Sequence, residues 1–498
     1  MLKGFRRNFR PLELLAEEEM EAIHQGALYV LLRTGMWVEH ERVLQLLADH
    51  GCQVDFQERQ AKIPTPLVEE CLRQCPSSYR LKARVGEKDL MVGGDKVYFM
   101  QGMGMRYLDL NTWETRPASA REHREAMIVA DALENVHLAD GVFFYMERAG
   151  IPPQMVMLEN LASGLKYSSK AQHFGYQPEC EGFAIRMAQA LGINLNAEMD
   201  TAFPLTIYAG AIEAAYHYIQ ADIAIMPCMG ITMGAEGPVT HAGSMVLAIA
   251  MTMAWVVLAQ LIKPGAPLVI EHGLKPMDMK RGSPRYGAAG HGLTTSAMNQ
   301  MLRRYRIPSC PSAGFTSPSK KIDYQCGYEK ATGALISALS GGNLLIFQGG
   351  SSVELLYNPV LSILDDDVAG WIGRFLEGVT VSDETMAVDL INQVGPIPGH
   401  YLGTAHTREW WRREQTLPQA ADLEAYPVWV RSGKKDALAL ARERMDEILA
   451  SHKPMPLTAE EEQALADILA EARESFRGMG QISDAEWSAY MKALESST

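Results

Sequence analysis

The stretch that decides the fold, residues 222–260, reads DIAIMPCMGITMGAEGPVTHAGSMVLAIAMTMAWVVLAQ. It opens with a short apolar run, 223–226, which Pro227 ends, as is typical of a buried strand. Pro238 suits the first position of a helix, where its missing N–H costs nothing. Residues 245–261 contain neither Gly nor Pro and are almost entirely apolar, which predicts a helix that is buried on most sides.

A glycine-rich turn connects this strand to this helix. Gly230, Gly234 and Gly237 permit positive φ angles and a close approach between the backbone and a ligand. Folds of the α/β class place their ligand sites in such turns, after the carboxyl end of a strand. The turn therefore indicates either a ligand loop or a tight connection without a ligand.

Apolar runs with the same rhythm recur along the chain, each followed by a turn and a helix. The predicted strands are 97–100, 136–144, 171–175, 205–208, 223–226, 268–271, 309–311 and 344–347. The predicted helices are 122–133, 155–163, 179–191, 211–218, 238–261, 294–305, 324–339 and 365–376. Eight strand–helix units within about 250 to 300 residues are typical of an α/β chain forming a (β/α)₈ TIM-type barrel. A doubly wound sheet is the alternative.

The segments on either side of these units read differently. Residues 79–116 alternate in polarity and contain turn residues, which predicts short antiparallel strands. Capping and proline signals predict helices at 17–34, 39–50 and 64–74, and charged amphipathic helices follow the repeats at 383–391, 433–451 and 458–476. We therefore expect an N-terminal helical region (1–80), a catalytic barrel (81–380) and a C-terminal helical extension (381–498) that packs on the barrel or on a second subunit.

Composition limits the possible partners and compartment. The chain has 498 residues, a formal net charge of −14 and 47% apolar residues, which favours a soluble globular protein over one that binds nucleic acid or an anionic membrane. Its seven scattered cysteines fit a reducing cytoplasm. Residues 242–262 are long enough to cross a membrane, but Ser244, Thr252 and Gln260 favour a core helix.

Residues at the carboxyl ends of the predicted strands are the candidates for the site. They are Gln101, Phe143, Tyr145, His173, Tyr176, Met229, Glu271, His272, Phe315, Phe347 and Gln348. The set is rich in aromatic rings, and aromatic faces bind a quaternary ammonium group, which has no N–H to donate. Each ring could equally be part of the core. The sequence therefore predicts a site for a permanently charged cation only if several rings meet at one end of the sheet.

The same set is poor in metal ligands and nucleophiles. Common zinc spacings, a nucleophile elbow and a phosphate-binding loop are all missing from the sequence. Glu271 and His272 are the candidate acid/base residues, with Asp278 nearby. Glu271, His272 and Cys310 are an alternative zinc set, but we expect no tightly bound metal.

Motifs spread over nearly the whole chain resemble the trimethylamine methyltransferase family by their order and spacing. They are IHQGA (23–27), TGM (34–36), IP (63–64), LVEE (67–70), PCMG (227–230), GPVTHAG (237–243), QLIKPGAP (260–267), DM (278–279), KKIDYQCGYE (320–329) and GGN (341–343). The resemblance implies a (β/α)₈ barrel that moves a methyl group from a methylated amine to the Co(I) centre of a separate corrinoid protein.

One departure from the family bears on the substrate. The founding trimethylamine enzymes carry pyrrolysine, whereas this chain contains only the twenty common residues, with Ile346, Phe347 and Gln348 in the stretch 341–352 where that residue is expected. The resemblance is therefore to the pyrrolysine-lacking branch, which includes glycine betaine methyltransferase and relatives acting on carnitine or proline betaine.

The expected chemistry matches the composition of the site, because a quaternary amine leaves without needing a proton and the corrinoid supplies the nucleophile. The expected substrate-binding residues are Phe143, Tyr145, His173, Tyr176, Phe315, Phe347 and Gln348, with Gly230, Gly234 and Gly237 in the covering loop. Glycine betaine is the expected substrate and the cytoplasm the expected location, and we expect a homo-oligomer that binds neither nucleic acid nor membranes. The alternatives are an enzyme for trimethylamine or another betaine, and a non-catalytic barrel that binds a betaine or a corrinoid protein.

Overall fold

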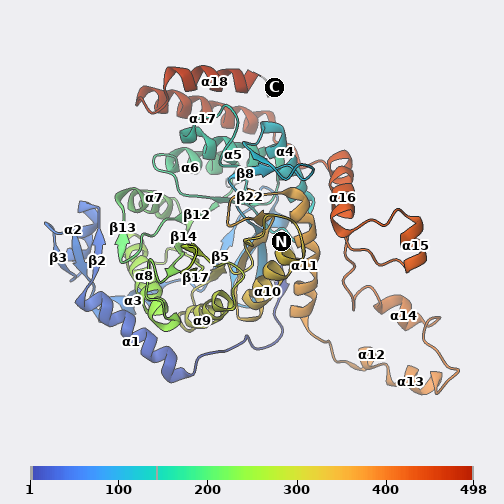
Figure 1. Ribbon diagram of the computed structural model, residues 1–498. Coiled ribbons are helices and arrows are strands. Elements are labelled where there is room, and N and C mark those ends of the chain that lie inside the picture. Colours follow the sequence, from blue (N-terminus) through green and yellow to red (C-terminus); the bar gives the residue numbers. More distant parts are fainter. Residues whose placement is uncertain (1–3, 142–143, 496–498) are drawn as a thin grey trace.

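A curled sheet of eight parallel strands lies at the centre of the computed structural model, which describes residues 4–141 and 144–495 (Figure 1). The strands are β7 (Lys96–Gln101), β10 (Leu138–Ala139), β11 (Ala171–Phe174), β12 (Leu195–Met199), β14 (Ala224–Met229), β16 (Ile270–His272), β19 (Ser309–Pro311) and β20 (Leu344–Gln348). They are nearly all buried, as expected for a parallel sheet covered by helices.

The strands follow one another in the sheet in chain order, from β7 through β19, and β20 pairs with the free edge of β7. The last two strands of the parallel sheet, β19 and β20, therefore lie at opposite ends of this path. A backbone hydrogen bond of 2.9 Å from Asn343 N–H to Ser309 O connects them. Near the start of the chain, β1 (Phe5–Arg6) adds an antiparallel pairing to β7.

Helices alternate with the strands and cover the outside of the sheet, as the repeating pattern predicts. They are α4 (Ala120–Ala132), α5 (Pro153–Tyr167), α6 (Glu181–Ala190), α7 (Ala209–Gln220), α8 (His241–Ile262), α9 (Ala289–Tyr305), α10 (Tyr324–Leu339) and α11 (Pro359–Glu377). By length and composition α8 could span a membrane, but 83% of its most apolar window is buried. It is a core helix, because α1 (Glu17–Arg33), α3 (Thr65–Gln74) and α7 pack around it.

The fourth strand lies elsewhere than predicted. The apolar run 205–208 contains only β13 (Thr206–Ile207), which pairs with β2 (Met36–Val38) of the N-terminal region, whereas the sheet uses β12. The sequence of β12 is Leu-Asn-Ala-Glu-Met, and the polar Asn196 and Glu198 face the inside of the sheet. A buried parallel strand is usually recognised by a run of apolar residues, and polar side chains on its inner face interrupt that run.

The N-terminal region contains the predicted helices α1 (Glu17–Arg33), α2 (Glu41–Asp49) and α3 (Thr65–Gln74), together with three short strands, β2 (Met36–Val38), β3 (Gln53–Asp55) and β4 (Gln60–Lys62). The predicted antiparallel pair is present as β5 (Ser78–Leu81) and β6 (Leu90–Gly93). Side chains of this pair, including Leu81 and Val92, pack with Tyr98 and Leu344 from the inside of the sheet. The hairpin therefore closes the amino end of the sheet and leaves the carboxyl end for the site.

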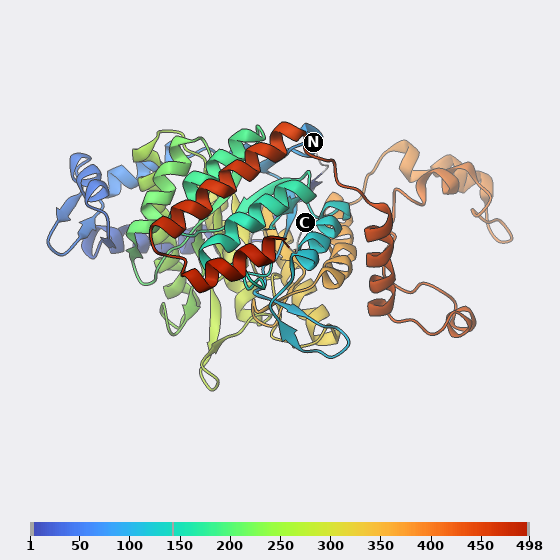
Figure 2. The same ribbon diagram turned by 90° about the horizontal axis from the view of Figure 1, so that it is seen from above.

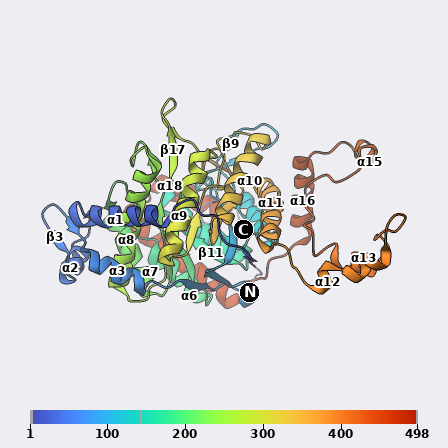
Figure 3. The same ribbon diagram turned by 90° about the horizontal axis from the view of Figure 1, so that it is seen from below.

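The C-terminal extension has two parts. Helices α16 (Ala437–Ser451), α17 (Ala459–Gly478) and α18 (Asp484–Glu495) lie near the body, where α16 contacts α11 and α4, and α17 contacts α5 and α6. The short helices α12 (Asp383–Met386), α13 (Val388–Val394), α14 (Ala405–Trp410) and α15 (Tyr426–Arg431) extend away from it in both further views (Figures 2 and 3).

Candidate functional site

The register of the sheet decides which side chains point inward. Neighbouring residues across a parallel ladder share a face, and successive residues along a strand alternate between faces. Cys228 pairs with Glu271, and Glu271 pairs with Cys310, so these three side chains share one face at the carboxyl ends of β14, β16 and β19. That face is the inside, because Cys310 belongs to the inner apolar cluster.

Two buried carboxyl groups and a thiol meet on this inner face. Glu198 at the end of β12, Cys228 in β14 and Glu271 in β16 place one carboxylate oxygen or sulfur each within 4.8 Å of one another. Each glutamate side chain is about nine-tenths buried, with a residue exposure of 7%. Glu271 Oε2 makes no hydrogen bond within the described part of the chain. The cluster therefore places two carboxyl groups, with acceptor capacity to spare, where water is scarce.

Burial and mutual repulsion raise the pKa of both glutamates. Burial raises the pKa of Glu198 to about 8, with a further contribution from Asp200 and Glu354. Burial and the neighbouring Glu198 raise the pKa of Glu271 well above its ordinary value, while Lys275 opposes the shift. Since an opposite charge favours the ionised form, a cation bound between these carboxyl groups would lower their raised pKa values.

A chain of hydrogen bonds orients Glu198. The Tyr79 hydroxyl donates to Asn196 Oδ1 (2.8 Å), and the Asn196 amide lies 3.2 Å from His173 Nδ1. If the amide donates to Nδ1, the His173 proton lies on Nε2, which is 3.2 Å from Glu198 Oε2. Burial lowers the pKa of His173, which keeps the ring neutral. His173, a predicted site residue, therefore lies beside the cluster as a donor to Glu198.

Two aromatic rings and a lysine lie at the same end of the sheet. Tyr286, which precedes α9, has its ring centre 6.3 Å from that of Phe315 at an angle of 78°. Lys275 Nζ lies 4.9 Å from the centre of the Tyr286 ring, and the Tyr286 hydroxyl bonds to the Glu354 carboxylate. Phe315, another predicted residue, thus lies beside Tyr286, which contacts the charged groups, and Tyr286 is a ring that the sequence reasoning missed.

The predicted glycine loop closes over the cluster. A Cβ atom at Gly230 would lie 3.4 Å from the Cys228 sulfur and 3.8 Å from Lys275 Nζ. Gly234 has φ +97°, and a Cβ at Gly237 would lie 2.9 Å from side-chain atoms of two neighbours. The expected helix start at Pro238 is wrong, because α8 begins at His241. A positive φ angle accounts for Gly234 and close packing accounts for Gly237, whereas a Cβ at Gly230 would make only ordinary contacts.

Three predicted residues point away from the cluster. His272 follows the inward Glu271 and therefore faces α9, where its Nε2 lies 2.9 Å from Asn299 Oδ1. Phe347 packs in the outer apolar cluster between the sheet, α10 and α11. A bulge interrupts β20 between Ile346 and Gln348, and the Gln348 amide donates to the Asn135 carbonyl at 3.0 Å.

The remaining predicted aromatic residues lie apart from the cluster or outside the described residues. Tyr145 is fully buried in an outer cluster beside α4, where its ring centre lies 5.7 Å from that of Tyr357. The Tyr176 hydroxyl lies against α7, so close that a Cβ at Gly210 would clash with it. Phe143 lies outside the described residues. Aromatic content alone therefore could not identify the rings that meet at the mouth of the sheet.

The zinc set considered from the sequence is not assembled. His272 faces outward, whereas Glu271 and Cys310 face inward. The set that does converge, Glu198, Cys228 and Glu271, offers three ligand atoms within 4.8 Å, a donor set of the kind found in zinc sites with an open position. It equally offers negative charge to an organic cation.

An enclosed acidic cluster at the carboxyl end of a curled, helix-covered parallel sheet places the chain among the α/β enzymes. Comparison with protein families identifies which one: the profile of the trimethylamine methyltransferase (MTTB) family matches residues 1–477, and the chain belongs to this family. It is therefore a methyltransferase, as the sequence motifs indicate.

Individual relatives agree with this assignment. The glycine betaine methyltransferase of Desulfitobacterium hafniense strain Y51 is 29% identical over 476 residues, covering 92% of this chain and 96% of that protein. The trimethylamine methyltransferase MttB of D. hafniense strain DSM 10664 / DCB-2 is 27% identical, with 93% and 94% coverage. A crystal structure of the Methanosarcina barkeri monomethylamine methyltransferase MtmB has a TM-score of 0.51 at 11% identity, with 93% and 88% coverage, which supports the fold alone.

Proposed function

We propose that this protein transfers a methyl group from a quaternary amine, with glycine betaine the best candidate, to the Co(I) corrinoid of a partner corrinoid protein. The proposal rests on the combination of ionisable groups at the carboxyl end of the sheet. Two buried glutamates lie near one lysine, the Tyr286 ring lies against that lysine, and Phe315 contacts Tyr286. Glycine betaine likewise joins a permanent cation to a carboxylate.

In this proposal the ammonium group binds against Glu198 and Glu271, and the rings of Tyr286 and Phe315 contact its methyl groups. A cation over an aromatic face gains about 0.5 to 2 kcal/mol. The betaine carboxylate faces Lys275, so that the substrate has one orientation. This orientation fixes one methyl group toward the open end of the sheet, and positioning alone can supply up to about 7–11 kcal/mol of the barrier.

The residues present fit an external nucleophile. Burial, reinforced by Glu271, raises the thiol pKa of both Cys228 and Cys310 well above its ordinary value, so neither is an activated thiolate. The bound Co(I) centre would supply the nucleophile that attacks the methyl carbon. The C–N bonding pair would then stay on nitrogen, and the neutral tertiary amine would leave without a proton from the protein. The chain's own role is to bind, orient and shield the substrate.

The substrate assignment within the family rests on the sequence and on this site. Only the twenty common residues occur between 341 and 352, and the two relatives described above differ in the amines they are named for. A trimethylamine, carnitine or proline betaine enzyme is the alternative, and a non-catalytic barrel that binds a betaine or a corrinoid protein is another. A lysine beside the acidic cluster favours a zwitterion over trimethylamine.

We further infer that the eight strands work as a closed (β/α)₈ barrel in the cytoplasm, divided at about the boundaries 1–80, 81–380 and 381–498. The backbone bond between Asn343 and Ser309 supports closure, because it bridges the last two strands. The corrinoid protein would approach the carboxyl end of the strands, since the β5–β6 hairpin covers the amino end.

A methyl-transfer assay with an amine panel tests the function. Purified protein is incubated with free cob(I)alamin and glycine betaine, proline betaine, carnitine or trimethylamine, and methylcobalamin is followed by absorbance. We expect turnover with glycine betaine and the least with trimethylamine. A preference for trimethylamine would contradict the substrate assignment, and no product from any methylated amine would favour the non-catalytic alternative.

The pH dependence of substrate binding follows from the raised pKa of Glu198. A quaternary cation binds the ionised cluster, whereas the free protein keeps Glu198 protonated up to a pKa of about 8. Affinity should therefore rise with pH between 6 and 8, by up to ~10-fold per pH unit, as Glu198 ionises. Measuring the KM for glycine betaine from pH 6 to 9 checks this; an affinity independent of pH would separate the cation from Glu198.

Paired phenylalanine variants distinguish the two faces of the sheet. Phe315→Ala removes a ring beside the charged groups and should raise the KM for glycine betaine roughly tenfold, as expected when about 1–2 kcal/mol of cation–π contact is lost. Phe347→Ala removes a fully buried outer ring and should lower the unfolding free energy by about 3–5 kcal/mol while leaving KM unchanged. An increase in KM for Phe347→Ala but not for Phe315→Ala would instead place the substrate on the outer face of the sheet.

A further inference from the structure

One segment of the chain forms an ordered structure without a core of its own. Residues 379–413, which we call the arm, leave the end of α11 and include α12, α13 and α14. Every residue of the arm is described, and none of them is buried. Its exposed large apolar side chains are Val379, Val381, Met386, Val388, Ile391, Ile397, Tyr401, Leu402 and Trp411.

Such a segment cannot be stable in water by itself. Its three helices have four, seven and six residues, whereas isolated helices shorter than about 12–15 residues are marginal even with favourable sequences. Ordering a residue costs about 1–2 kcal/mol of backbone entropy, which burial must offset. The defined conformation of the arm therefore requires a surface that covers it.

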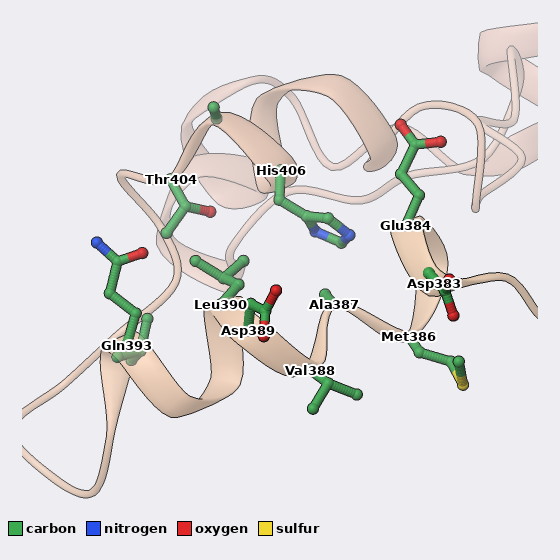
Figure 4. Close-up of a pocket in the computed structure, with 12 residues that line it drawn as sticks. Asp383, Glu384, Met386, Ala387, Val388, Asp389, Leu390, Gln393, Thr404 and His406 are labelled. Carbon is green, nitrogen blue, oxygen red and sulfur yellow. The ribbon is translucent and has the colours of Figure 1, made fainter.

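The arm has a shape and polar groups suited to such a cover. It folds around a hollow of about 880 Å³, and the close-up shows Leu390, Thr404 and His406 around that hollow (Figure 4). His406 Nε2 and Trp410 Nε1 are shielded from solvent, yet neither makes a hydrogen bond within the described residues. Shielded polar groups without partners are costly, so acceptors from another chain would stabilise both.

The body carries a matching uncovered patch beside the base of the arm. Trp371 and Phe375 on α11 stack with ring centres 5.6 Å apart, and Phe9 contacts Phe375 edge-on at 6.1 Å. All three side chains are exposed, because the arm of the same chain turns away from α11 (Figures 1 and 3). Each chain thus has one apolar arm and one apolar patch, and they do not meet.

The charge of the arm and the stoichiometry favour a second copy of this chain as the partner. The arm contains four carboxylates and three arginines, so it is nearly neutral although the chain carries −14. Two such arms can approach each other without the repulsion that two −14 bodies would feel elsewhere. Every molecule has an arm that needs a covering surface, and a second copy of the same chain is always present in the same amount.

We propose that the arm is an exchanged dimerisation element, which packs across a two-fold axis against the arm and the Phe9–Trp371–Phe375 patch of a second copy. A two-fold interface uses the same surface on both subunits, and exchange of an element is a low-cost route to it. The arm is of the size that a standard interface of about 20–30 residues per side requires. This interface is separate from the acidic cluster and does not depend on the substrate.

Sedimentation of the full-length chain tests the proposal. Wild-type protein should be a dimer or a higher even-numbered oligomer at about 10 µM. Ile397→Asp with Leu402→Asp, which places charges at two of the three most exposed apolar positions of the arm, should raise the dimer dissociation constant at least ~100-fold, because it buries unpaired charge. Phe375→Asp on the body should have the same effect.

The matched control is Phe56→Asp. Phe56 lies in the turn between β3 and β4 and is as exposed as Phe375, and its replacement should leave the dimer intact. Hydrogen exchange of the wild-type arm gives a second readout that does not need a variant. Protection in residues 379–413 should be lost on dilution. A monomeric wild type, arm variants that remain dimeric, or arm protection independent of concentration would each overturn the proposal.

Discussion

The double variant Glu198→Gln with Glu271→Gln should lose ~30- to 5,000-fold in kcat/KM for glycine betaine. Glutamine keeps the size and hydrogen bonding of each side chain but removes the negative charge that faces the ammonium group. Removing the partner of a buried charge costs about 2–5 kcal/mol, which gives this range. Steady-state kinetics of methyl transfer to cob(I)alamin measure the loss.

The single variant Glu198→Gln shows whether the two carboxyl groups act together. Glu198 is the second cause, after burial, of the raised pKa of Glu271. Removing its charge should lower the Glu271 pKa and shift the pH dependence of KM toward lower pH. The control is Glu443→Gln, an exposed carboxylate on α16, which should change nothing. A double variant with wild-type kcat/KM would remove the cluster from substrate binding.

The variant Lys330→Met should lower the free energy of unfolding by about 3–5 kcal/mol, the cost of breaking a buried ion pair. Lys330 is buried on α10 and lies 3.4 Å from Asp365. Its Nζ also donates to the carbonyls of Phe315 (2.8 Å), Phe347 (2.7 Å) and Gly350 (2.9 Å). This one ammonium group therefore ties the segments after β19 and β20 together, including the segment that positions Phe315.

Chemical denaturation measures this effect, and a second variant tests its cause. Burial raises the pKa of Asp365 to about 6 even with Lys330 beside it. Lys330→Met leaves that carboxylate without its counter-charge, so Lys330→Met with Asp365→Leu should recover part of the lost stability. A loss below about 1 kcal/mol for Lys330→Met would mean that the ammonium group does not hold these segments.

Sequence patterns predicted the strand–helix alternation where strands are apolar on both faces. The runs that became β7, β14 and β20 are of this kind. They misplaced the fourth strand, because Asn196 and Glu198 interrupt its apolar character on the face that carries the site. The polar residues of the site therefore made this strand hard to recognise from the sequence, and Glu198 was not predicted as a site residue for the same reason. A polar five-residue segment between two helices was the only available signal.

The site was harder to predict than the fold, because one residue of strand phase decides which side chains face inward. Glu271 and His272 are adjacent in the sequence, yet only Glu271 joins the cluster. In the same way Ile346 faces the inside and Phe347 the outside. Tyr286 lies between elements, where no strand-end rule could nominate it. Register and long-range contacts, which fix these orientations, are properties of the folded chain.

The most direct measurement is a crystal structure of the protein with glycine betaine. We expect the trimethylammonium nitrogen within about 6 Å of the Tyr286 and Phe315 ring centres, a distance at which cation–π contact is significant, with Glu198 and Glu271 beside it and the betaine carboxylate toward Lys275. A betaine bound elsewhere, or a metal ion held by Glu198, Cys228 and Glu271, would contradict it.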